Sequence, residues 1–224
     1  MQGRQPTMTR DVFRDRADAG RRLAVRVLEC QPARPVVLAL PRGGVPVAAE
    51  VARACKAPLD LVLVRKLGAP SNPELAVGAV CGTPDDPQIL RHPGTMRQLG
   101  VPDSWIDRAA ARELAEIERR RRIYLGDRPP VDIKGRTVVL VDDGIATGAT
   151  VSLALQLLRR QRPLRLLLAV PVAPPSALAT LKPLCDDIVT LIATEDFHGV
   201  GQFYRDFHQV SDSEVVALLK GQDQ

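Results

Sequence analysis

The most constraining feature of this 224-residue chain is one continuous string, TVVLVDDGIATGAT, which spans residues 137–150. Its first five residues are apolar or β-branched and have the length of a buried strand. Two carboxylates, Asp142 and Asp143, follow at once, and a loop of small residues leads from them into an amphipathic run with helical spacing. The string therefore predicts a buried strand, an acidic pair, a small-residue loop and a helix start, in that order.

The loop of this string has the composition of an anion-binding site. It consists of Ala146, Thr147, Gly148, Ala149 and Thr150. Small side chains let an anion approach the backbone N–H groups, and the free N–H groups at a helix start favour negative charge. Carboxylates just before the loop would repel a phosphate, but they suit the vicinal hydroxyl groups of an attached sugar. The residues therefore predict a sugar-phosphate site, with an ordinary strand–turn–helix as the bland alternative.

The same string resembles the phosphoribosyl-pyrophosphate (PRPP) binding motif of type I phosphoribosyltransferases. The resemblance implies that Asp142 and Asp143 hold the ribose hydroxyls and that residues 146–150 hold the 5′-phosphate. It implies a pentosyltransferase, which moves the 5-phosphoribosyl group of PRPP to a nitrogenous base and releases pyrophosphate. Mg²⁺ is the expected cofactor, bound chiefly through oxygens of PRPP with Asp142 and Asp143 as candidate contacts, so no all-protein metal site is expected.

A second glycine-containing loop, Pro41-Arg42-Gly43-Gly44, lies between an apolar strand candidate at 35–40 and an Ala- and Val-rich helix candidate at 45–55. From the residues alone it is either a tight turn or a second anion site built from loop amides and Arg42. In the resemblance it takes the place of the pyrophosphate loop, which often contains a strained or cis peptide. The resemblance therefore implies that Arg42, Gly43 and Gly44 bind pyrophosphate.

Two cations, Arg65 and Lys66, follow another apolar strand candidate at 60–64. Ordinary strand-end charge would account for them, but ligands of open α/β sheets bind at the carboxyl ends of strands. In the resemblance an Arg-Lys pair at this position reaches the pyrophosphate. We therefore expect Arg65 and Lys66 to act in catalysis together with Asp142 and Asp143.

The succession of strand and helix candidates predicts an α/β fold, a doubly wound and mostly parallel sheet with helices on both faces. We expect a core over 1–192, interrupted by a helical insertion at about 81–128, and a C-terminal hood or cap over 193–224 within the same domain. A first amphipathic helix is predicted over 11–30, with its Arg and Asp residues on the exposed face. The insertion contains a long, highly charged helix from Asp103 to Tyr124.

Four of the seven aromatic residues fall within eleven residues near the C-terminus: Phe197, Phe203, Tyr204 and Phe207. One interpretation is a small hydrophobic cluster that packs the cap onto the sheet. The sharper one follows from the resemblance, because the nucleobase of this family usually lies under a hood with an aromatic face. On that interpretation Phe203 or Tyr204 stacks on the acceptor.

Composition narrows the class of protein further. The net charge of +5 suits an anionic substrate, and the basic run Arg119–Arg122 lacks the interleaved aromatic residues typical of nucleic-acid binding. The four cysteines are widely spaced, which argues against a zinc site or a disulfide framework. No apolar run could span a membrane and the N-terminal residues lack a signal-peptide core, so we expect a cytoplasmic protein. The expected partners are PRPP, a small-molecule acceptor and a second copy of the chain.

The acceptor stays open at this point. Enzymes for 6-oxopurines often carry an acidic residue just before the Thr-Gly of the loop, where this chain has Ala146. The loop resembles the adenine- and uracil-type loops instead, which puts hypoxanthine and guanine in doubt. Glu74, in a segment that would close over the site, is a candidate general base. The competing hypothesis is a non-catalytic regulator on the same fold, which senses PRPP or nucleotides or binds RNA.

Overall fold

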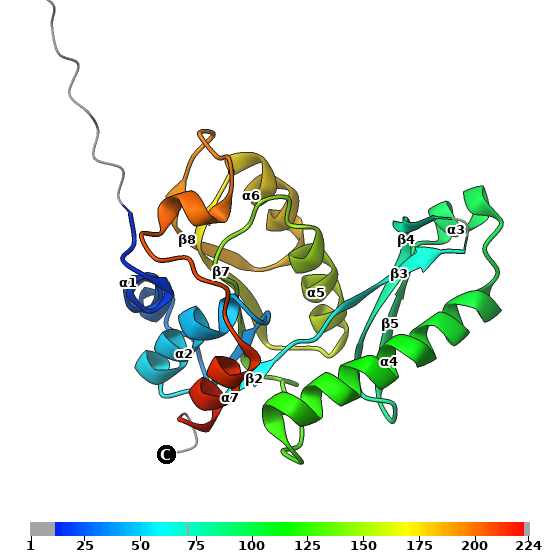
Figure 1. The fold of residues 1–224 in the computed structure, drawn as a ribbon, viewed down its shortest axis with the longest axis horizontal. Helices are drawn as coiled ribbons and strands as arrows, with labels where there is room; N and C mark the ends of the chain where they lie inside the picture. The colour runs from blue at the N-terminus through cyan, green and yellow to red at the C-terminus, as the bar shows by residue number, and fades with distance from the viewer. Residues whose placement is uncertain (1–11, 71, 222–224) are drawn as a thin grey trace, which may run out of the picture.

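A five-stranded parallel sheet forms the centre of the molecule (Figure 1). The computed structural model describes residues 12–70 and 72–221, without the side chain of Glu74, the suggested general base. The strands lie in the order β2-β1-β6-β7-β8, and every neighbouring pair is parallel. Their bounds are β1 (Pro35–Ala39), β2 (Leu59–Leu61), β6 (Thr137–Val141), β7 (Arg165–Ala173) and β8 (Asp187–Ala193). The predicted α/β class and parallel sheet are confirmed.

Helices cover both faces of this sheet, because successive side chains of its strands point to opposite sides. Val37 and Val139 pack in one core cluster, whereas their neighbours Val36 and Val138 pack in another. The first cluster includes residues of α1 (Arg16–Glu29), α2 (Gly44–Cys55) and α7 (Asp212–Lys220), and the second includes residues of α5 (Ala149–Arg160) and α6 (Pro175–Leu181). In the part of the chain that the structure describes, no helix combines the length and apolar character needed to cross a bilayer.

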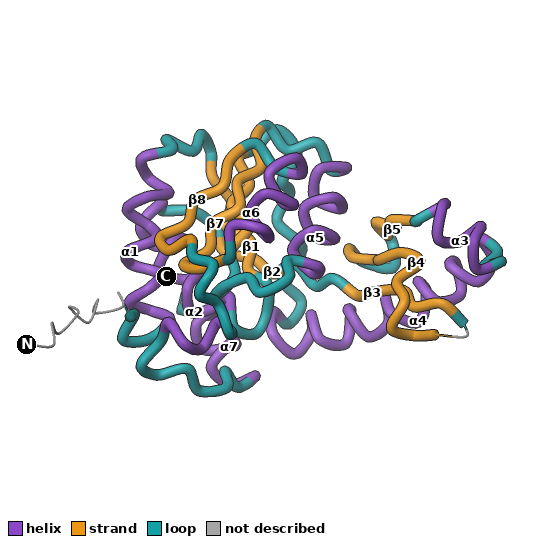
Figure 2. The backbone as a smooth tube through the Cα atoms, turned by 90° about the horizontal axis from the view of Figure 1, so that it is seen from above, coloured by secondary structure: helices purple, strands orange, loops and turns teal. Residues whose placement is uncertain are grey.

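A second, smaller unit stands to one side of the core (Figures 1 and 2). It is an antiparallel sheet in the order β3-β4-β5 with two helices packed on it, and it has a hydrophobic cluster of its own. Its elements are β3 (Arg65–Ala69), β4 (Asn72–Gly82), β5 (Pro87–Arg91), α3 (Pro93–Leu99) and α4 (Asp103–Leu125). We call residues 65–125 the excursion unit. It begins well before the helical insertion expected at 81–128, and it includes a sheet.

This arrangement changes the setting of Arg65 and Lys66. The core strand β2 already ends at Leu61, and the two cations open β3 in the excursion unit. The sequence placed them at the end of a core strand, and the structure does not. The reason is that residues 65–69 pair with β4 in an antiparallel ladder, and such a nonlocal pairing is not visible in the apolar run at 60–64.

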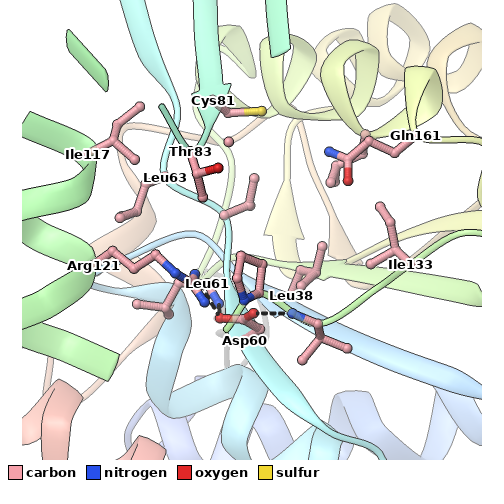
Figure 3. Close-up of a pocket in the computed structure, with 15 residues that line it drawn as sticks. Leu38, Asp60, Leu61, Leu63, Cys81, Thr83, Ile117, Arg121, Ile133 and Gln161 are labelled. Carbon is pink, nitrogen blue, oxygen red and sulfur yellow. Dashed lines mark hydrogen bonds and ion pairs between the residues drawn. The ribbon is translucent and has the colours of Figure 1, made fainter. Parts of the chain in front are cut away.

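A buried charge cluster joins the excursion unit to the core (Figure 3). Asp60 on β2 is 2% exposed, and its carboxylate accepts hydrogen bonds from the backbone N–H groups of Leu61 (2.8 Å) and Val131 (2.9 Å). The guanidinium of Arg121 on α4 lies 3.4 Å from the same carboxylate, and that of Arg128 lies 3.8 Å away. The carboxyl end of α4 is thereby fixed against β2.

The C-terminal cap is tied to the start of the chain. The N–H of Phe13 donates to the carbonyl of Phe203 at 2.8 Å, and the N–H of Arg205 donates back to the carbonyl of Phe13 at 2.9 Å. A short 3₁₀ turn, η2 (Val200–Phe203), precedes this bridge, and another, η1 (Lys182–Leu184), follows α6. Ser211 and Glu214 form a capping box at the start of α7.

Replacement of Asp60 by alanine tests the charge cluster. The substitution leaves the guanidinium groups of Arg121 and Arg128 without their buried carboxylate. We therefore expect the free energy of unfolding to fall by about 3–5 kcal/mol. Glu118→Ala is the matched control, because it breaks a solvent-exposed pair with Arg122 on the same helix and should cost less than about 1 kcal/mol. Urea denaturation of both variants measures the difference. Equal losses would show that the cluster does not fasten the excursion unit.

Candidate functional site

The two predicted ligand loops meet at the carboxyl ends of neighbouring strands. β1 and β6 pair in register, and the N–H of Leu40 donates to the carbonyl of Val141 at 3.0 Å, just before both loops begin. A Cβ atom on Gly43 would overlap the Oδ2 atom of Asp143, and one on Gly44 would lie 2.8 Å from the carbonyl oxygen of Val141. Only glycine lets the 41–44 backbone lie directly on the acidic pair. The peptide bond between Pro41 and Arg42 is cis, as the resemblance implied.

The acidic pair is half-buried and tightly organised. The N–H of Asp143 donates to Oδ1 of Asp142 at 2.9 Å, and Oδ2 of Asp143 forms an ion pair with Nε of Arg16 at 2.7 Å. Burial raises the pKa of both carboxyl groups, and the neighbouring Asp143 charge raises that of Asp142 further. The hydrogen bond from Arg16 opposes the rise at Asp143. One cation therefore faces two carboxylates, and it favours the ionised form of Asp143.

The 146–150 loop leads directly into α5. Gly148 is buried and has a φ of 75°, which favours glycine, and α5 begins at the next residue. Ala146, Thr147, Ala149 and Thr150 are exposed. The N-cap residue Gly148 has no side chain to cap the helix, and the N–H of Ala149 donates to Oγ1 of Thr147 at 3.5 Å. Among the described residues, the first turn of α5 carries no acidic residue, so the helix dipole at this end favours negative charge.

Of the three predicted cations, only Arg42 lies at the junction of the two loops. Its Nη1 atom is 3.5 Å from Oδ1 of Asp212 on α7, and its side chain is 38% exposed. Arg65 instead forms an ion pair with Glu113 on α4, with Nε and Oε2 2.7 Å apart. Lys66 is exposed on β3. The structure therefore places Arg65 against the excursion unit rather than in contact with the acidic pair.

The aromatic cluster corrects one expectation. Phe203 is 4% exposed and Tyr204 is 6% exposed, and both pack in a cluster with Phe13. The hydroxyl of Tyr204 donates to the backbone carbonyl of Asp143, so this ring supports the acidic pair from below the surface. Neither ring offers a free face on which a base could stack. Phe207 is the exposed ring of this cluster among the described residues, at 37%.

Sequence reasoning misses Arg16. The sequence pattern places it among the exposed charges of the first helix, but in the structure it is 7% exposed. The overlooked signal is its spacing, because Arg16 lies on the buried side of α1 together with Gly20, Leu23 and Val27. A charged residue on the apolar stripe of a helix needs a buried partner. Asp143 is that partner.

A small cavity lies between the core and the excursion unit, away from the loop junction (Figure 3). Asp60, Cys81, Ile117 and Gln161 are among its lining residues, and its volume is about 80 Å³. That space is small for a nucleobase with its ribose. Burial raises the pKa of the Cys81 thiol to about 12, which leaves it inert as a nucleophile. This cavity therefore lacks the space and the reactive groups that the loop junction offers.

Comparison with known proteins places the chain. Residues 12–208 match the phosphoribosyl transferase domain. The chain belongs to the phosphoribosyl transferase family. Two proteins of Mycobacterium tuberculosis, provisionally named phosphoribosyl transferases, are each 43% identical to it over 208 residues, which is 93% of this chain. The chain spans about half the length (46%) of these curated relatives.

Solved structures share the phosphoribosyl transferase fold of this chain. A protein from Thermus thermophilus is 45% identical, with a TM-score of 0.81 over 94% of this chain and 99% of that one. A Neisseria gonorrhoeae protein solved with bound ppGpp is 14% identical, with a TM-score of 0.52 over 96% of this chain and 98% of that one. At 14% identity the likeness to the second protein shows the fold alone.

The raised carboxyl pKa values make a prediction about stability. The folded protein holds protons on the pair more tightly than the unfolded chain, so ionisation lowers the free energy of unfolding as pH rises above the ordinary value of 3.8. Asp142→Asn removes that penalty. We expect this variant to be more stable than the wild type at pH 8, with a smaller difference at pH 5.

Urea denaturation at the two pH values measures this difference. Asp127→Asn, which changes an exposed carboxylate after α4, is the control and should leave stability within about 0.5 kcal/mol. A loss of stability in Asp142→Asn at pH 8 would contradict the prediction.

Proposed function

We propose that this member of the family is a PRPP-dependent pentosyltransferase that transfers the 5-phosphoribosyl group to a nitrogenous base. The observation that carries the proposal is the junction itself. A glycine loop lies directly on an acidic pair, and the same pair is followed by the 146–150 loop and the start of α5. This arrangement supports the proposal, because PRPP needs contiguous sites for a phosphate, for sugar hydroxyls and for a second anionic group.

Each part of PRPP has its own set of groups in this proposal. The 5′-phosphate binds the amides and hydroxyls of residues 146–150. The ribose hydroxyls donate to Asp142 and Asp143, each of which keeps one carboxylate oxygen without a recorded hydrogen bond within residues 12–70 and 72–221. Arg42 and the 43–44 amides receive the pyrophosphate. As the bond from C1 to the base nitrogen forms, the C1–O bond breaks and its electron pair leaves with pyrophosphate.

The protein would contribute mainly position and charge. Rigid strands hold the two loops, so the reacting groups meet without further reorganisation. Fixed N–H donors and Arg42 stabilise charge on the departing pyrophosphate. Arg65 and Lys66 stay candidates for the same role, and Arg65 would have to leave Glu113 to take it. In this proposal a movement of the excursion unit would bring them over the site.

Mg²⁺ fits the donor set as an ion shared with the substrate. Among the described residues, no cluster of three or more His, Cys, Asp or Glu side chains could hold a metal ion. Asp142 and Asp143 would contact the ion through the same oxygens that accept the ribose hydroxyls, while PRPP supplies the other ligands. When bound, the ion would neutralise charge on the pyrophosphate.

The acceptor, the assembly and the compartment remain expectations of the proposal. A nitrogenous base is the acceptor class, and Ala146 argues against 6-oxopurines. We also propose a cytoplasmic homodimer. The alternative function is a non-catalytic sensor of PRPP or nucleotides, or an RNA-binding regulator. The Neisseria gonorrhoeae protein with bound ppGpp motivates a nucleotide as one ligand to test.

Titration with PRPP by calorimetry tests the proposal. We expect saturable binding that requires Mg²⁺ and that falls by at least about 100-fold in the Asp142→Asn/Asp143→Asn variant, because two charge-assisted hydrogen bonds are lost. Pyrophosphate release with a panel of bases then separates an enzyme from a sensor. Binding without release for any base would favour the regulator. Absence of PRPP binding by the intact protein would contradict the proposed enzyme and a PRPP sensor, and it would leave nucleotides and RNA as the ligands to test.

A further inference from the structure

Arg16 is the buried cation nearest the proposed ribose site, and it comes from the first turn of α1. A guanidinium is rarely buried without a partner, because removing its charge from water is costly. Here the side chain is 8% exposed. Its surroundings therefore show what holds it in place.

Hydrogen bonds and aromatic rings surround the guanidinium of Arg16. Its Nε donates to Oδ2 of Asp143 at 2.7 Å, and its Nη1 donates to the backbone carbonyl of His208 at 2.8 Å. Its Cζ atom lies 3.9 Å from the centre of the Phe207 ring, which is within range of a cation–π interaction. The fork of one arginine thus joins α1, the cap and the acidic pair.

The carboxylate of Asp143 is consequently fixed from two sides. Its Oδ2 atom lies between Arg16 and the backbone of Gly43, where a Cβ atom would overlap it. The hydroxyl of Tyr204 holds the backbone carbonyl of the same residue. These contacts leave Oδ1 as the oxygen that can face a ligand.

We propose that Arg16 is a positioning residue for the ribose site, which clamps Oδ2 of Asp143 so that Oδ1 is presented to a sugar hydroxyl. The inference rests on the proposed function, since it concerns the sugar of PRPP. Lysine cannot replace this geometry, because a single ammonium group lacks the planar fork that reaches Asp143 and His208 at once. Arg16 acts through Asp143 and does not itself contact the substrate.

Calorimetric titration with PRPP and Mg²⁺ tests the clamp in five variants and the wild type. We expect Arg16→Gln to bind PRPP roughly 10- to 100-fold more weakly, the range for loss of a charge-assisted hydrogen bond, and Arg16→Lys to be intermediate. In an Asp143→Asn background, Arg16→Gln should change the affinity less than about twofold, because the coupling of two contacting residues is lost with either one. Arg22→Gln is the matched control on the same helix. It lies over Phe13 at 5.4 Å and pairs with Asp18, and it should bind like the wild type.

The outcomes separate this inference from the proposed function. If the wild type binds PRPP and Arg16→Gln binds equally well, the clamp is wrong and the PRPP site stands. An equal loss from Arg16→Gln in both backgrounds would show a general structural role and would also overturn the clamp. If Arg16→Gln does not fold, Arg16→Lys measured in the two backgrounds decides in the same way. Absence of PRPP binding by the wild type would overturn both.

Discussion

The contact between the glycine loop and the acidic pair is the constraint on which the rest of the site depends. It requires β1 and β6 to be neighbours in register, so that both loops leave the sheet at the same edge. It also requires Gly43 and Gly44, because a Cβ atom at either would collide with the acidic segment. The ligand sites are therefore joined by backbone packing, which a rigid parallel sheet can hold to within the tolerance that catalysis needs.

Half-burial of Asp142 and Asp143 has an electrostatic cost, and residues outside the central sheet offset part of it. Burial disfavours their ionised forms. Arg16 compensates at Asp143, and the hydroxyl of Tyr204 holds the backbone there. Tyr204 belongs to the bridge with Phe13, and Arg16 donates to the backbone carbonyl of His208 in the cap. The cap thus holds Arg16 beside the Asp143 carboxylate. The aromatic cluster of Phe13, Phe203 and Tyr204 holds the cap in place.

Local sequence signals predicted the strand β6, the small-residue loop after it and the helix α5, because an apolar β-branched run and a helix start are encoded by neighbouring residues. Nonlocal features were harder to predict. The strand that carries Arg65 pairs with β4 in a separate sheet, and no periodicity within residues 60–66 reveals that partner. Phe203 and Tyr204 suit a stacking role by type, but their burial depends on Phe13, far away in the sequence. The partner of Arg16 likewise lies 127 positions away.

A crystal structure of the protein with ribose 5-phosphate tests the central claim most directly, because this ligand carries the phosphate and the vicinal hydroxyls alone. The account predicts the phosphate on the amides of residues 146–150. It also predicts the two hydroxyls within hydrogen-bond distance of Asp142 Oδ2 and Asp143 Oδ1, with the Arg16–Asp143 pair unbroken. A ligand bound elsewhere, or one whose hydroxyls turn away from the acidic pair, would contradict it.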